Sequence, residues 1–357
     1  SPLVLAIPLP IGISFFTFES MSYVIDVYRG EIEPQRSYLE YLTFVAFFPH
    51  LVAGPIVRPK ALLPQLAESA AWDGERASRS LLLIGTGLFK KIAIGDYLGS
   101  NLVDRVFDAP TQYSALECYV AVLAYAVQIY SDFSGYTDIA IGSAGLLGVH
   151  FPDNFDAPYI AHDIVDFWRR WHISLSTWLR DYLYIPLGGN RRGRARTYFN
   201  LLATMLLGGL WHGANWTFLV WGGLHGAALA VNRAWRELKS RERPRAWWGH
   251  AAGVVVTFHF VLFAWIFFRA DSLRSARILL GELATLTTYH PNLDGRVLGI
   301  LALGLALHLL PTRFETAARQ RFTALPAAAQ GVVLFGLMLT VRHMASSEAV
   351  PFVYFQF

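Results

Sequence analysis

Long apolar blocks recur along this sequence and restrict what it can fold into. A helix needs about 20 consecutive apolar residues to cross the hydrocarbon layer of a bilayer, and several blocks reach or approach that length. Backbone polar groups in lipid must be satisfied internally, which a helix does by itself. We therefore predict an all-α polytopic membrane protein. The blocks are Ser80–Leu98, Leu116–Ile129, Phe199–Trp211, Thr217–Val231, Ala251–Phe268, Val297–Leu310 and Ala327–Val341.

The composition agrees with a membrane location. Charged residues make up 16% of the 357 residues and hydrophobic residues 54%, whereas soluble domains carry about 25% charged residues. Cys118 is the single cysteine, so no intrachain disulfide forms. The net charge of +4 is modest and no nucleic-acid-binding motif occurs, so nucleic acid is not an expected partner. We expect one membrane domain over residues 1–357, lacking earlier helices because an apolar run is already under way at Ser1.

Arginine and lysine gather in three places, which indicates topology. The clusters are Lys90–Lys91, Arg169–Arg196 and Arg233–Arg245. Short loops rich in these residues stay in the cytoplasm. The segment Thr197–Asn232 lies between the two larger clusters, so it is predicted to enter and leave the membrane on the same side. Its length suits a tight re-entrant hairpin of two short helices.

The middle of this predicted hairpin carries polar and small side chains. Residues Gly208–Trp216 include two glycines, His212 and Asn215. Irregular backbone at membrane depth is tolerated only against protein or a water-filled cavity. A histidine there is expected to be neutral, because burial disfavours the imidazolium, and a neutral imidazole accepts a proton. Asn215 or the backbone near Gly213 are candidate donors to an oxyanion.

Two further segments depart from simple apolar patterning. Asp166–Ile185 repeats apolar residues at spacings of three and four, which predicts one amphipathic helix at the membrane interface with His172 beside its apolar stripe. Polar groups also interrupt an apolar region between Gln128 and Asp138. Ionisable groups at such depth need partners or a function. Asp132 and Asp138 are open to two interpretations, as relay carboxylates or as partners of neighbouring hydroxyls.

Several motifs together resemble the membrane-bound O-acyltransferase (MBOAT) family, in its bacterial alginate O-acetyltransferase branch. The resemblance covers nearly the whole chain in order. The motifs are Phe47–Ile56, Tyr130–Asp138, Phe167–Ser176, Tyr182–Asn190, Gly209–Trp216, Trp221–Gly226 and Pro351–Phe357. One departure is that family members have further helices before the position of Ile7.

The resemblance implies a helical bundle around a transmembrane tunnel with two histidines near its narrowest part. By motif match these are His212, the family's signature histidine, and His172. It also implies acetyl-CoA as the acyl-donor substrate from the cytoplasm, with no permanently bound cofactor. The acceptor is then an exopolysaccharide hydroxyl or a separate periplasmic acetyltransferase, and the location is the bacterial inner membrane.

A patch of arginines is predicted to meet the phosphates of CoA at the cytoplasmic mouth through bidentate contacts. The positive-inside rule explains any single member equally well. The patch is Arg169, Arg170, Arg180, Arg191 and Arg192. The histidines lack the spacing of a zinc site, so no metal is expected. His225, thirteen residues after His212, remains open between function and packing.

Other functions remain to be tested against this one. D-alanyl or other acyl transfer to cell-envelope polymers is the near alternative. A polysaccharide exporter predicts inverted repeats or paired broken helices, and no such symmetry is seen in the sequence. A non-catalytic scaffold predicts tolerance to the loss of both histidines.

Overall fold

The computed structural model describes residues 12–68, 70–238, 247–345 and 352. Within these ranges the chain is helical and contains no strand, which confirms the predicted all-α fold there. Most of the Pro351–Phe357 motif, Ser1, Ile7 and the end of the Arg233–Arg245 cluster lie outside the described residues.

Sixteen numbered α-helices order the described chain, with shorter turns between them. Their bounds are α1 Ile13–Tyr28, α2 Tyr38–Val45, α3 Phe48–Leu51, α4 Pro59–Ala67, α5 Gly74–Leu88, α6 Asp104–Asp108, α7 Ala115–Leu146, α8 Ile164–Arg170, α9 Ile173–Leu179, α10 Arg194–His212, α11 Trp216–Leu238, α12 Trp247–Arg269, α13 Leu273–Ala284, α14 Gly295–Leu309, α15 Thr312–Thr323 and α16 Ala327–Met344. Each of the seven predicted apolar blocks falls largely within helix.

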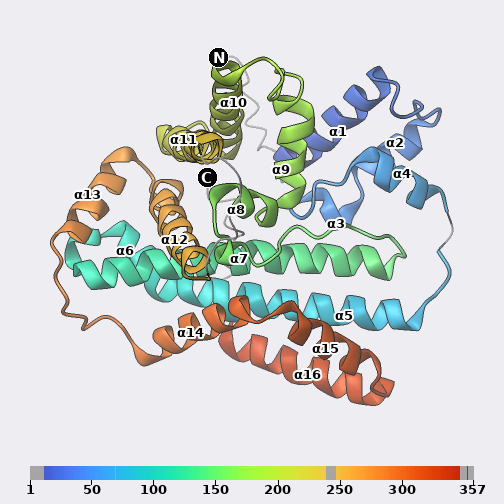
Figure 1. The fold of residues 1–357 in the computed structure, drawn as a ribbon. Coiled ribbons are helices and arrows are strands. Elements are labelled where there is room, and N and C mark those ends of the chain that lie inside the picture. The colour runs from blue at the N-terminus through green and yellow to red at the C-terminus, as the bar shows by residue number, and fades with distance from the viewer. Residues whose placement is uncertain (1–11, 69, 239–246, 346–351, 353–357) are drawn as a thin grey trace, which may run out of the picture.

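The long helix α7 and the run that begins with α5 form the platform of the fold. They lie side by side across the molecule (Figure 1). Glycines let the two backbones approach closely, because a Cβ at Gly87 would lie 2.5 Å from the carbonyl oxygen of Gly135. The same holds at Gly142, where a Cβ would lie 2.6 Å from the Ser80 carbonyl oxygen. Gly87 meets Gly135, whereas the earlier residue Ser80 meets the later residue Gly142, so the helices are antiparallel.

Ion pairs across this platform neutralise the carboxylates in the polar stretch of α7. After α5 the chain continues as a π-helical segment, Phe89–Asp96, that carries both lysines. Lys90 Nζ lies 2.7 Å from Asp138 Oδ2, and Lys91 Nζ lies 2.6 Å from Asp132 Oδ1. Lys91 also pairs with Asp96 at 2.5 Å. The two lysines therefore lie in a helix, as the apolar block Ser80–Leu98 predicted, and they neutralise carboxylates within the protein.

Helices α10 and α11 form the predicted hairpin, joined by the three residues 213–215. Glycines again bring two backbones together. A Cβ at Gly209 would lie 2.3 Å from the Phe218 carbonyl oxygen, and one at Gly222 would lie 2.3 Å from that of Met205. This register is antiparallel, which confirms the hairpin. Its helices have 19 and 23 residues, longer than the two short helices expected. The depth of the hairpin in a membrane stays a prediction.

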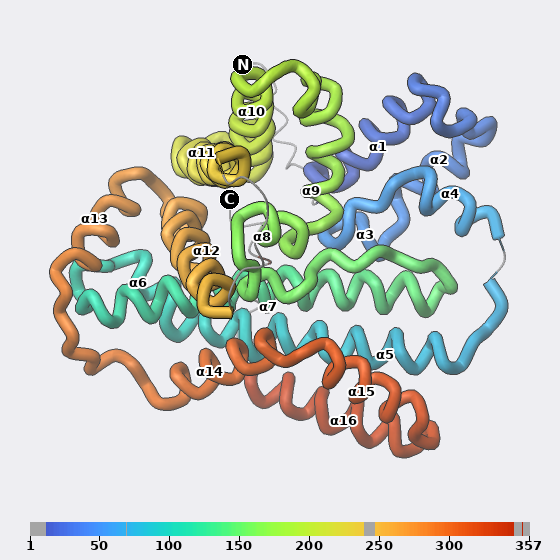
Figure 2. The backbone as a smooth tube through the Cα atoms, viewed as in Figure 1, coloured from blue at the N-terminus to red at the C-terminus, as the bar shows by residue number. Residues whose placement is uncertain are grey.

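The other helices enclose the two pairs. Figure 2 follows the chain from α12, which packs on α7 and α11, to α14, α15 and α16, which pack along the α5 run. Within the described residues, α12 and α16 are long and apolar enough to cross a membrane. Helices α14 and α15, bent by 92° at a short break, make a third candidate span.

Breaking one platform ion pair is expected to destabilise the fold. In Lys90→Met the Asp138 carboxylate loses its partner, which costs about 3 kcal/mol at a largely buried site. The double variant Lys90→Met, Asp138→Leu removes both charges and is expected to recover most of that loss. Thermal unfolding of the purified full-length protein in detergent measures both. Equal destabilisation by the single and the double variant would contradict a buried pair.

Candidate active site

His172 occupies a strained break between two helices. Helix α8 ends at Arg170 and α9 begins at Ile173, and His172 between them has a left-handed backbone with φ 44°. Such a conformation costs a residue other than glycine about 1–3 kcal/mol, so other contacts must enforce it. The Ile173 N–H donates to the Asn154 carbonyl oxygen at 3.0 Å, and the Ser174 hydroxyl donates to Asn154 Oδ1 at 2.9 Å.

This break corrects the prediction of one amphipathic helix over Asp166–Ile185. The periodicity of apolar residues is real, and it spans α8, α9 and a π-helical segment, Arg180–Tyr184. Backbone bonds to Asn154, a residue distant in sequence, replace a continuous helical ladder at His172. The break turns the imidazole inward, where it is 1% exposed.

The His172 ring is buried against aromatic groups. The ring centroid of Phe133 lies 4.6 Å away in an edge-on arrangement. Neither ring nitrogen of His172 has a hydrogen-bond partner in the described part of the chain. Buried polar side chains nearly always have one, and a buried group without one needs an explanation. A neutral imidazole without a partner is available to a substrate.

His212 is the last residue of α10 and lies at the tip of the hairpin. Its ring contacts Trp221 of α11 at 5.2 Å between centroids and Phe268 of α12 at 4.9 Å. Three elements therefore position the imidazole, and its residue as a whole is half-buried. Gly213 follows α10 in an extended conformation, and the chain then turns into α11.

The structure brings the two predicted histidines to one aromatic cluster. The Trp211 ring lies 6.4 Å from the His172 ring and 4.9 Å from the His212 ring, centroid to centroid. The ring of Phe18, on α1, stacks on the Trp211 indole with 5.0 Å between the ring centroids. Residues from α1, the α8–α9 break and α10 thus meet at this point, although 40 positions separate the histidines in sequence.

Asn215, a predicted oxyanion donor, has structural partners. Its side-chain amide donates to the Asp271 carbonyl oxygen at 2.9 Å, and its Oδ1 accepts the Thr217 N–H at 3.2 Å. Both bonds fix the start of α11 and join it to the segment after α12. The side chain is therefore committed to holding the hairpin tip in place.

The five predicted arginines divide into members with ion pairs and members that are exposed. Arg170 pairs with Asp166 at 2.8 Å and with Asp156 at 3.2 Å, while Arg180 pairs with Asp181 at 2.6 Å. Burial opposes ionisation of Asp166, yet hydrogen bonds from Arg170 and the His162 backbone hold the pKa of Asp166 below its usual range. The remaining members, Arg169, Arg191 and Arg192, are exposed.

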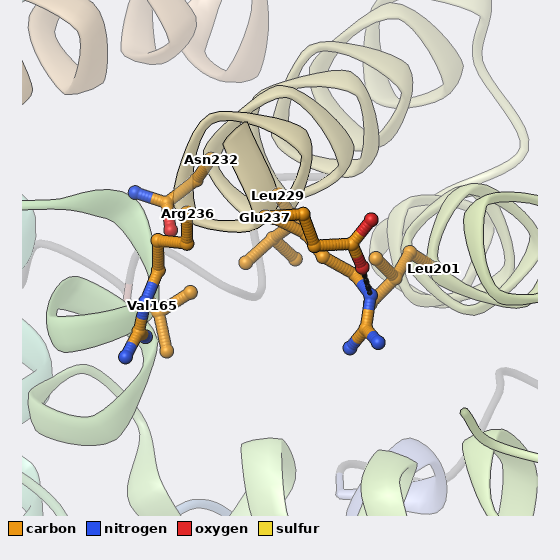
Figure 3. A pocket seen from close by; sticks show the side chains of 7 residues that line it. Val165, Leu201, Leu229, Asn232, Arg236 and Glu237 are labelled. Atoms are coloured by element: carbon orange, nitrogen blue, oxygen red, sulfur yellow. Dashed lines mark ion pairs between the residues drawn. The ribbon is translucent and has the colours of Figure 1, made fainter. Parts of the chain in front are cut away.

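A pocket of about 350 Å³ lies between α8, α10 and α11. Figure 3 shows the side chains that line it: the Arg236 side chain extends toward Val165 of α8, and Glu237 turns toward Leu201 of α10. Arg233 Nε pairs with Glu237 Oε1 at 3.0 Å. In the sequence, Arg233 indicated membrane topology only, and the pocket was not predicted. The lining residues are Val165, Leu201, Leu229, Asn232, Arg233, Arg236 and Glu237.

The register of α11 connects this pocket to His212. Leu229 lines the pocket, and His225 and Trp221 follow at intervals of four residues on the same face of the helix. Each interval advances about 6 Å along the axis. Leu229, at the near edge of the pocket, and Trp221, which contacts His212, therefore lie about 12 Å apart along α11. The described residues contain no group of three His, Cys, Asp or Glu side chains suited to holding a metal.

The described residues form helices, and some of these helices are long and apolar enough to span a membrane. Together with the histidines inside the protein and the pocket lined by arginines, they define a helical membrane protein with an internal polar site. Comparison with known proteins identifies the family. The model of the MBOAT, membrane-bound O-acyltransferase family, matches residues 13–270, and the chain belongs to that family.

Individual relatives are bacterial. The chain is 47% identical to a probable alginate O-acetylase AlgI of Azotobacter vinelandii over 267 residues, which is 74% of this chain and 52% of that protein. It is 44% identical to the probable alginate O-acetylase AlgI of Pseudomonas aeruginosa over 309 residues, or 85% and 58%. A peptidoglycan O-acetyltransferase of Helicobacter pylori is 40% identical over 299 residues, or 75% and 55%. The chain thus spans about half the length of these relatives.

Close packing of the hairpin is expected to be necessary for the site. In Gly222→Ala the new Cβ would lie 2.3 Å from the Met205 carbonyl oxygen, so α10 and α11 must separate. Gly223→Ala is the matched control, because its Cβ would meet Leu206 Cδ2 at an ordinary 3.7 Å. We expect a melting temperature several degrees lower for Gly222→Ala and little change for Gly223→Ala. Equal melting temperatures would contradict this helix register.

Proposed function

We propose that the protein is an O-acetyltransferase that moves an acetyl group from acetyl-CoA to the far side of the bacterial inner membrane. The observation that carries this proposal is the meeting of His172 and His212 in one aromatic cluster, which α11 connects to a basic pocket. The O-acetylases and the O-acetyltransferase among its relatives support acetyl as the group transferred.

The chemistry needs a base near a thioester. A hydroxyl oxygen of the acceptor attacks the acetyl carbonyl carbon, forming the new ester bond, while the carbon–sulfur bond breaks. We assign His212 as the base that takes the hydroxyl proton, which then passes to the leaving thiolate of CoA. His172, buried without a hydrogen-bond partner among the described residues, supports this step at the other edge of Trp211. The aromatic walls exclude bulk water, which would otherwise hydrolyse the thioester.

The acceptor is proposed from the relatives. The alginate O-acetylases among the relatives support an exopolysaccharide hydroxyl such as that of alginate. A separate periplasmic acetyltransferase is the partner that we propose completes the transfer. D-alanyl transfer to a cell-envelope polymer is the alternative within the same chemistry. Export or scaffolding without catalysis is the alternative outside it.

Loss of the His212 imidazole is expected to abolish acetylation. Removal of a general base costs about 100-fold to 10,000-fold in rate. The measurement is acetate released by mild base from secreted polysaccharide, in cells whose full-length protein carries His212→Ala, with membrane abundance checked by blotting. His343→Ala, at an exposed histidine of α16, is the control.

Three outcomes separate the candidate functions. Loss of acetylation at normal abundance supports catalysis at His212 and directs the same test to His172. Retained acetylation excludes His212 from the chemistry. Absence of polymer from the medium favours export or scaffolding.

The basic pocket is proposed to hold the nucleotide phosphates of the donor. Arg236 and Arg233 lie on its wall, and a guanidinium binds phosphate oxygens through paired hydrogen bonds. The exposed Arg169, Arg191 and Arg192 are proposed to add positive charge at the cytoplasmic mouth. Asn232 adds a neutral amide to the wall.

Removing one pocket arginine is expected to weaken the binding of donors that carry the nucleotide, and of those donors only. Arg236→Gln should raise the KM for acetyl-CoA about tenfold, the value of one charge-assisted hydrogen bond. It should leave the KM for S-acetyl-pantetheine unchanged, because that donor lacks the nucleotide. Release of free thiol by membranes that hold the full-length protein and its acceptor polymer measures both. Arg277→Gln, at an exposed arginine of α13, is the control, and an equal rise for both donors would contradict phosphate binding.

A further inference from the structure

His225 is a buried polar group that the proposed reaction does not use. It lies on α11, is 0% exposed, and is enclosed by aromatic rings. The centroids of Trp221 and Phe260 lie 4.8 Å and 5.5 Å from its ring. A polar side chain in such surroundings costs free energy unless each polar atom finds a partner.

One hydrogen bond fixes which nitrogen of His225 carries the proton. Trp168 Nε1–H donates to His225 Nδ1 at 3.2 Å. An indole is only a donor, so Nδ1 acts as the acceptor, and the neutral imidazole carries its hydrogen on Nε2. No acceptor for this Nε2–H exists in the described residues. A buried donor without an acceptor destabilises the fold, and such a group needs an explanation.

The same cluster contains more donors without acceptors. The Nε1–H groups of Trp221 and Trp265 are buried and have no hydrogen-bond partner in the part of the chain that the structure describes. Their rings are stacked 6.0 Å apart, and Trp221 lies 4.8 Å from His225. Three N–H donors therefore share one apolar surrounding. The ligand chemistry complementary to such a set is a chain that carries carbonyl oxygens.

Two of these donors, on His225 and Trp221, lie along α11 between the pocket and the residue that contacts His212. Leu229 at the pocket is one helical turn from His225, and Trp221 one turn further on contacts His212. On the facing helix α8, Val165 lines the pocket, and Trp168, three residues on, contacts His225. A donor whose phosphates occupy the pocket and whose thioester reaches His212 must pass His225 with its pantetheine arm.

We propose that His225 and Trp221 bind the amide carbonyl oxygens of the pantetheine arm through their N–H groups. This inference rests on the proposed function, because it takes a CoA thioester as the donor. Trp168 holds His225 in the tautomer that presents Nε2–H and is itself only partly buried. His225 is then a substrate-binding residue that sets how far the thioester extends toward His212.

A thermodynamic cycle between protein and ligand tests this contact. The ligands are an unreactive thioether analogue of acetyl-CoA and the same analogue with both amide groups replaced by uncharged trans-alkene units, which lack the carbonyl oxygens. The proteins are the full-length wild type and His225→Phe, which keeps an aromatic ring and removes both nitrogens. Isothermal titration in detergent gives four dissociation constants. We expect carbonyl removal to weaken binding about tenfold in the wild type and less than twofold in His225→Phe.

Two further variants make the result decisive. Trp221→Phe removes only the indole N–H and serves where His225→Phe fails to fold, with the same reduced response to carbonyl removal expected. His308→Phe is the control, because His308 is also buried and accepts the Tyr159 N–H at 3.1 Å. It should lower stability and leave the tenfold carbonyl effect intact.

The failing outcomes are distinguishable. A carbonyl effect of equal size in the wild type and in both His225→Phe and Trp221→Phe would overturn the proposed contact and leave His225 a packing residue. That result would leave the proposed function untouched if His212→Ala still abolishes acetylation. Retained acetylation in His212→Ala would instead overturn the proposed function itself.

Discussion

The need of every buried polar group for a partner organises this protein. Inside an apolar helical assembly an unpaired charge or donor costs several times more than at a surface. Lys90 and Lys91 meet that requirement through Asp138 and Asp132, and their pairs hold the platform of α5 and α7 together. His172 and His225 leave ring nitrogens without partners in the described residues. The contrast separates groups that stabilise the fold from groups available to a ligand.

Local pattern predicted much of this architecture. The apolar blocks are helices, Thr197–Asn232 is a hairpin, and the glycines near His212 accompany close contact of α10 with α11. The break at His172 depends on Asn154, and the lysine pairs join segments some 40 residues apart. Contacts of this kind arise from tertiary packing, which periodicity in one segment does not contain. The pocket of α8, α10 and α11 was missed for the same reason.

The site uses strain and close packing to concentrate chemistry at one point. A left-handed residue turns His172 inward, and a glycine-lined hairpin carries His212 to the same Trp211 ring. Aromatic side chains contact both rings, and His172 is buried away from water. Helix α11 runs from the basic pocket to Trp221, which contacts His212. One helix therefore joins the proposed site of donor recognition to the proposed site of acyl transfer.

The proposed binding of the donor along α11 is best tested by a structure of the full-length protein with a thioether analogue of acetyl-CoA. We expect the nucleotide phosphates to contact Arg236, the pantetheine arm to pass His225, and the acetyl group to lie beside His212. An analogue bound with its acetyl group away from both His212 and His172 would contradict it.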